Sequence, residues 1–119
     1  MKSKNHQALI SFLKIIEGIS SKEYQKRVWI EGSGPECDDF DETVNCFFDN
    51  GRPILENFKH YDITEDQYSI LNFFFNMFEA FSDEHDWPAE FIDTPEWTKI
   101  TEMAKEVLKA FHWKTPDQD

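Results

Sequence analysis

The chain has 119 residues and a mass of 14.2 kDa, the size of one domain, and its 39% hydrophobic and 16% aromatic residues are enough for one buried core. With 24 Asp and Glu against 12 Lys and Arg, the formal net charge is −12, which disfavours binding to nucleic acids and to anionic membranes. No apolar stretch is long enough to span a bilayer and the first residues lack the features of a signal peptide, so we expect a single cytoplasmic domain, residues 1–119.

Apolar residues at three- and four-residue spacing predict a first amphipathic helix that ends near Gly18. Ser20 and Glu23 have the spacing of a capping box, which predicts the start of a second, short helix. The glycines and the proline of residues 31–36 cannot continue a helix and predict a loop. The second helix is expected to turn Tyr24, Val28 and Trp29 toward the core.

Asp39 and Glu42 predict the start of a third helix, and the pair Asn50-Gly51 predicts its end. The expected buried residues of this helix are Phe40, Val44, Phe47 and Phe48. Pro53 suits the first turn of a further short helix, because that position needs no backbone N–H.

Thr64 and Gln67 form the clearest capping box, and the helix that follows extends to about Ser82. At ~1.5 Å per residue its roughly 19 residues reach about 28 Å, the width of a small domain. Apolar residues cover nearly its whole circumference, which is typical of a central helix surrounded by others. Among them, the residues expected in the core are Phe73, Phe74, Phe75, Phe78 and Phe81.

Thr94-Pro95 predicts the start of the last helix, because threonine is a good N-cap and proline is favoured at the first helical position. Its apolar face begins at Trp97 and continues to Phe111. Strand-like alternation is nearly absent from the chain. The predicted fold class is therefore all-α, a compact bundle of about five to six helices around a central Phe-rich helix.

The charge is concentrated in the middle of the chain. Residues 1–30 carry a balance of +4, residues 31–96 a balance of −16, and residues 97–119 a balance of zero. Like charges at this density oppose folding and indicate a cationic partner, although a solvated surface that only keeps the protein soluble remains the alternative. The candidate partner-binding residues are Glu31, Glu36, Asp38, Asp39, Asp41 and Glu42 in a first cluster, and Asp83, Glu84, Asp86 and Trp87 in a second.

Trp87 is included because tryptophan beside carboxylates often anchors a protein interface. Either cluster alone can be the binding surface, the other then serving only solubility.

No pattern in the sequence indicates catalysis, a metal or a cofactor. An EF-hand loop from Asp39 would need glycine and glutamate where Val44 and Asn50 stand. Cys37 and Cys46 lack metal-binding spacing and are expected to be reduced, unpaired thiols, buried or half-buried. The glycines of residues 32–34 lack a P-loop lysine, and no nucleophile elbow or Cys/His constellation occurs. We therefore expect a protein that is not an enzyme and needs no cofactor or metal.

The segment Trp29–Phe48, with the following Pro53-Ile-Leu55, resembles small helical immunity proteins of bacterial toxin systems, especially those of contact-dependent growth inhibition. The resemblance covers roughly a quarter of the chain. It implies a cytoplasmic, non-enzymatic protein that binds the C-terminal domain of a cognate toxin, frequently a nuclease, and blocks its active site or substrate surface. It assigns no individual binding residue.

The acidic composition supports the same class of function for its own reason. A nuclease carries Lys and Arg where the phosphate backbone lies, and an acidic protein surface competes for those groups. We expect an immunity protein that neutralises a basic toxin domain and binds neither nucleic acid nor membrane. The alternative is an acidic adaptor or a DNA mimic that binds another basic protein.

Overall fold

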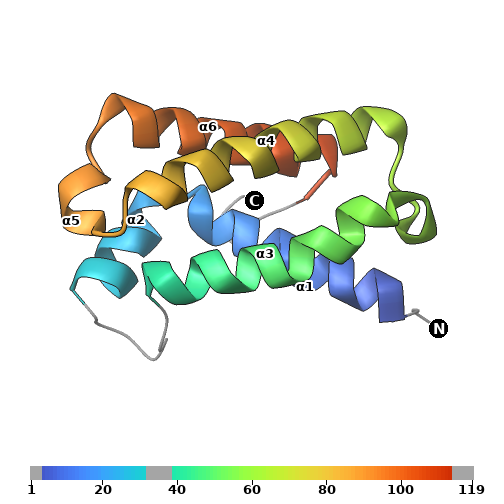
Figure 1. Ribbon diagram of the computed structural model, residues 1–119, viewed down its shortest axis with the longest axis horizontal. Helices are drawn as coiled ribbons and strands as arrows, with labels where there is room; N and C mark the ends of the chain where they lie inside the picture. The colour runs from blue at the N-terminus through green and yellow to red at the C-terminus, as the bar shows by residue number, and fades with distance from the viewer. Residues whose placement is uncertain (1–3, 32–38, 114–119) are drawn as a thin grey trace.

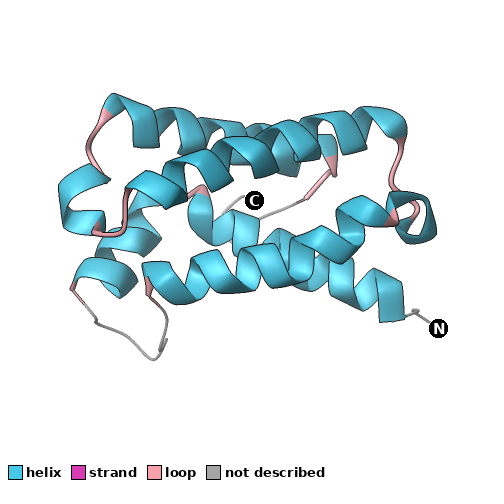
Figure 2. Cartoon of the chain, viewed as in Figure 1, coloured by secondary structure: helices cyan, strands magenta, loops and turns pink. Residues whose placement is uncertain are grey.

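The computed structural model describes residues 4–31 and 39–113, with the side chains from His6 onward. Over these residues the chain forms six α-helices, a π-helical turn and a 3-10 turn, and no strand (Figure 2). This confirms the predicted all-α class. The elements in chain order are α1 (Lys4–Ile19), α2 (Lys22–Gln25), η1 (Lys26–Ile30), α3 (Phe40–Glu56), η2 (Phe58–Tyr61), α4 (Glu65–Glu84), α5 (Pro88–Phe91) and α6 (Pro95–Ala110).

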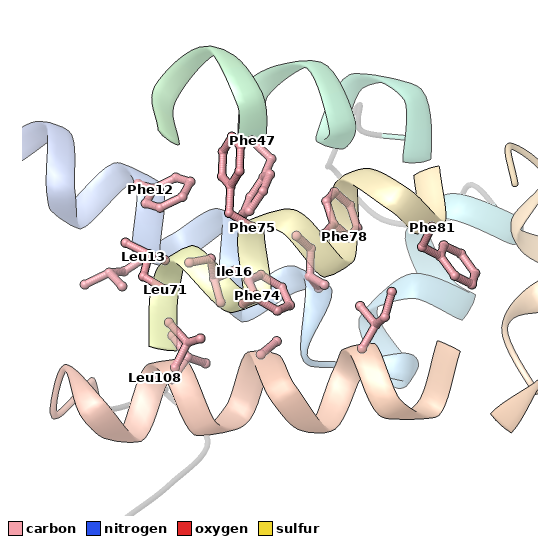
Figure 3. Packing of buried hydrophobic residues seen from close by; sticks show 14 of the residues in the cluster. Phe12, Leu13, Ile16, Phe47, Leu71, Phe74, Phe75, Phe78, Phe81 and Leu108 are labelled. Atoms are coloured by element: carbon pink, nitrogen blue, oxygen red, sulfur yellow. The ribbon is translucent and has the colours of Figure 1, made fainter. Parts of the chain in front are cut away.

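The four long helices lie along the same axis and alternate in direction (Figure 1). Helices α1 and α4 end at the pole that also holds α2, η1 and α5, and α3 and α6 begin there. We call this pole the α5 end. Helix α4 packs against α3 and α6, and α1 packs against the same two helices from the other side. The Phe-rich helix thus lies between α3 and α6, as Figure 3 shows.

Three predicted helix starts are confirmed by their capping hydrogen bonds. The backbone N–H of Glu42 donates to Asp39 Oδ1 at 2.8 Å, which opens α3. Thr64 and Gln67 bond reciprocally at the start of α4, backbone N–H to side-chain oxygen in both directions, at 2.9 and 3.1 Å. At the start of α6 the Thr94 hydroxyl accepts the backbone N–H of Trp97 at 3.3 Å. These local signals fix where the long helices begin.

The start of α2 is one residue later than predicted. Ser21, not Ser20, is the N-cap, and its hydroxyl accepts the backbone N–H of Tyr24 at 3.1 Å. The Ser20 hydroxyl instead donates to the carbonyl of Glu17 at 2.6 Å, at the end of α1. Two adjacent serines offer the same capping chemistry, so the spacing to Glu23 alone selects the wrong one.

The prediction that Asn50-Gly51 ends the third helix is wrong, because α3 continues to Glu56 with Pro53 inside it. A Cβ atom at Gly51 would lie 2.8 Å from a ring carbon of Phe12 and 2.9 Å from one of Phe75. The glycine therefore allows three helices to pack closely and does not end the helix.

Aromatic rings fill most of the core between the four long helices. Phe47 of α3 is fully buried, with its ring centroid 5.1 Å from Phe12, 5.2 Å from Phe75 and 4.9 Å from Phe78 (Figure 3). Such ring pairs add about 0.5–1.5 kcal/mol each beyond the area they bury. Phe73 was predicted to join them and does not, since 59% of it is exposed on the outer side of α4. The Phe-rich helix thus keeps one solvent-facing stripe.

A buried glutamine that sequence analysis missed connects three helices at the α5 end. Gln25 is fully buried, and its Nε2 donates to the carbonyls of Gly18 at 3.0 Å and Ile19 at 2.8 Å. Its Oε1 accepts the indole N–H of Trp97 at 2.8 Å. One side chain therefore caps the C-terminus of α1 and ties α2 to α6.

Candidate partner-binding surface

The fold brings the two predicted acidic clusters to the same end of the bundle. Helix α3 begins and helix α4 ends at the α5 end, so the first turn of one lies at the same pole as the last turn of the other (Figure 1). All the described candidates are exposed: Glu31, Asp39, Asp41, Glu42, Asp83, Glu84, Asp86 and Trp87. Glu36 and Asp38 lie outside the described residues, as does Cys37.

An aromatic cluster holds the helix ends together beneath these carboxylates. The Phe91 ring of α5 lies 4.9 Å from Phe40 at the start of α3, 5.0 Å from Phe81 at the end of α4 and 4.8 Å from Trp97 of α6. Trp29 of η1 adds a ring 5.4 Å from Phe40. Asp41, Glu42, Asp83 and Glu84 are therefore carried by helix ends that pack into one unit, whereas Asp86 lies in the short loop between α4 and α5.

The cations that α2 and η1 place at this end are Lys22, Lys26 and Arg27, fewer than the seven described carboxylates of the two clusters. Lys26 pairs with Asp93 at 3.6 Å, but the side chains are 51% and 77% exposed and such a pair contributes little. Counting only the residues that the structure describes, Asp41, Asp83, Glu84 and Asp86 form no ion pair. The α5 end therefore presents a concentrated negative potential to an approaching partner.

Part of the first cluster lies at the positive N-terminal end of its helix, and part of the second lies at the negative C-terminal end of its helix. Asp39 caps α3, and Asp41 and Glu42 occupy its first turn, where carboxylates complement the positive end of the helix dipole. Asp83 and Glu84 occupy the last turn of α4, which holds no basic residue. A carboxylate at that negative end costs roughly 0.3–1 kcal/mol. The first cluster thus supports the fold, whereas the second opposes it.

Two large hydrophobic residues are exposed at the α5 end. Trp87 is 63% exposed and precedes α5, where its backbone carbonyl accepts the N–H of Glu90 at 3.0 Å. Ile30 is 41% exposed at the end of η1, and η1 packs against α5. Sequence analysis singled out Trp87 but not Ile30, because nothing in its neighbourhood marks the last residue of a π-helical turn as exposed.

A groove of about 1350 Å³ lies over α1, α2 and α6 and reaches α3. Hydrogen bonds tie its walls together: Lys22 Nζ donates to the Thr98 hydroxyl at 2.7 Å, and the Trp113 indole N–H donates to Glu17 at 3.1 Å. Cys46 lines the groove as an exposed free thiol, so the expectation that it is buried or half-buried is wrong. Lysines and glutamates both line the groove, so its charge favours neither an anionic nor a cationic ligand.

Across residues 4–31 and 39–113, no helix combines the length and the hydrophobicity needed to cross a membrane. Over the same residues, no three His, Cys, Asp or Glu side chains are grouped closely enough to hold a metal ion. Comparison of the chain with family models, curated proteins and solved structures gives no match. The resemblance of Trp29–Phe48 to immunity proteins therefore stays a prediction.

Proposed function

We propose that this protein is a cytoplasmic immunity protein of the contact-dependent growth inhibition type. It binds the basic C-terminal domain of a cognate toxin, a nuclease, and covers its active-site or substrate-binding surface. The observation that supports the proposal is the placement of both acidic clusters, with the exposed Trp87, at one end of the bundle.

The electrostatics of the α5 end suit a competitor of nucleic acid. A nuclease surface that binds phosphates presents Lys and Arg, and a rigid surface with carboxylates such as Asp41 and Asp83 attracts the same groups. Unlike charges also raise the rate of encounter, which matters for a protein that must act before the toxin cuts its substrate.

The packing of the α5 end suits tight binding. An ordinary specific complex buries about 800 Å² on each partner. The ends of α3 and α4, together with η1 and α5, contribute to one surface that the aromatic cluster around Phe91 holds in place. A surface that is already ordered loses little conformational entropy when it binds, so more of the contact energy appears as affinity.

The proposal predicts that a neighbouring gene encodes a large secreted protein with a basic C-terminal domain, and co-expression with that domain tests it. We expect the two proteins to co-purify, the toxin domain alone to stop growth, and the pair to restore it. A complex without protection, or capture of an unrelated DNA-binding protein in its place, would favour the adaptor or DNA-mimic alternative and contradict the proposal.

A further inference from the structure

The α5 end exposes apolar side chains as well as carboxylates, and the apolar side chains can contribute hydrophobic contacts to a binding interface. Trp87 and Ile30 are exposed on neighbouring short elements, α5 and η1, and Lys26 of η1 pairs with Asp93 just beyond α5. Single exposed hydrophobic residues are common on protein surfaces, but the centres of binding interfaces are enriched in large aromatic and apolar side chains surrounded by a polar rim. Tryptophan is among the residue types most enriched at such centres, with tyrosine and arginine.

The end of α4 beside Trp87 also carries negative charge, as the C-terminal end of any α-helix does. The Phe81 carbonyl accepts the backbone N–H of His85 at 3.1 Å. Counting the described residues alone, no backbone or side-chain donor bonds the carbonyls of residues 82–84. Those carbonyls, together with the carboxylates of Asp83 and Glu84, form a site of negative charge that a partner's guanidinium or ammonium group would stabilise.

We infer that the centre of the binding surface is Trp87 and the C-terminal end of α4, and that its partner is a basic protein surface that presents apolar side chains among its arginines or lysines. This inference rests on the proposed function and specifies the partner's chemistry. An arginine of the partner pairs with Asp83 and Glu84 and stacks on the indole of Trp87, while an apolar side chain covers the remaining ring surface and Ile30. Asp41 and Glu42 act from the rim.

Fluorine NMR on the full chain tests this inference without the toxin. The protein contains four tryptophans, which 5-fluorotryptophan labels, and a Trp87→Phe variant identifies the Trp87 signal. The probe is a short peptide of alternating arginine and leucine, compared with arginine–glycine and glutamate–leucine peptides. We expect the arginine–leucine peptide to shift the Trp87 signal and to bind about fivefold or more tightly than the arginine–glycine peptide, since leucine covers the ring.

Two double variants, each lacking two carboxylates, distinguish a specific effect of the C-terminal end of α4 from a general effect of net charge. Asp83→Asn with Glu84→Gln removes two carboxylates from the C-terminal end of α4, and Glu65→Gln with Asp66→Asn removes two from its N-terminal end, at the opposite pole. The first pair is expected to weaken the peptide about threefold or more, and the second less than twofold.

Absent binding, equal binding of the leucine and glycine peptides, or a Trp87 signal that stays unshifted would each overturn the inference. The proposed function fails by a different result, the loss of growth protection in co-expression, so the two failures are distinguishable. A toxin domain that co-purifies equally well with Trp87→Ala would also overturn the inference and leave the proposed function standing.

Discussion

Replacing Gly51 with alanine is expected to destabilise the protein, although glycine is a poor residue for a helix interior. In an open helical position the change would stabilise by about 1 kcal/mol. At Gly51 the new Cβ would lie 2.8 and 2.9 Å from ring carbons of Phe12 and 2.9 Å from one of Phe75. Both rings are buried and pack against the buried Phe47 ring, so neither can rotate into solvent. Overpacking of this kind costs about 1–3 kcal/mol, more where two rings must move.

The expected net effect of Gly51→Ala is a loss of about 1–2 kcal/mol in the free energy of unfolding, measured by urea denaturation followed by far-UV circular dichroism. Gly18→Ala is the matched control, because its Cβ would meet only the half-buried Tyr24 ring at 3.3 Å, and we expect a change below about 1 kcal/mol. Adding Phe12→Leu to Gly51→Ala should cost less than the sum of the two single changes. A Gly51→Ala protein more stable than the parent would refute the close-packing interpretation.

Three further predictions concern the core and the groove. Gln25→Ala is expected to lower the free energy of unfolding by about 3 kcal/mol or more, because it leaves the Trp97 indole N–H and two carbonyls of α1 unsatisfied at about 1–3 kcal/mol each; a loss below about 1 kcal/mol would contradict the network. Phe78→Ala is expected to cost about 3–5 kcal/mol, whereas Phe73→Ala should cost less than about 1 kcal/mol, and similar losses at both would contradict the solvent-facing stripe. In thiol titration without reductant the unfolded protein is expected to show two free thiols, and Cys46 to react already in the folded state; an inert Cys46 would contradict its exposure.

Helix starts were predictable from the sequence because their signals are local. The hydroxyl of Thr64 and the amide of Gln67 satisfy backbone groups a single turn away, so their spacing carries the information. The end of α3 was not predictable in the same way. A glycine that terminates a helix and a glycine that admits a neighbouring ring look alike in sequence, and only the positions of Phe12 and Phe75 separate them.

The sequence did not predict the burial of individual residues correctly where that burial depends on contacts with other helices. Gln25 looks like a surface residue of a short helix, yet its partners are more than one turn away in α1 and on the distant Trp97. Phe73 looks like core because its neighbours are core, and an apolar run cannot show which stripe lacks a facing helix. Both errors come from the same source, since periodicity describes one helix and burial depends on several.

The candidate surface was predictable as composition but not as geometry. The sequence shows two acidic clusters separated by about forty residues. The clusters share one end because the two long helices that separate them along the chain, α3 and α4, run in opposite directions. The opposite dipole environments of Asp41 and Asp83 follow from the same alternation.

The measurement that tests the central claim most directly is the association rate, across a salt series, with the basic toxin domain that the proposal predicts a neighbouring gene to encode. The parent protein is compared with a variant in which Asp41 and Asp83, one from each cluster, are replaced by lysine; Asp39 is kept because it caps α3. We expect the parent's rate to fall steeply with salt, and the variant to associate at least about tenfold more slowly at low salt with a flatter dependence. Equal rates and equal salt dependence for the two proteins would show that the α5 end is not the surface that meets the toxin.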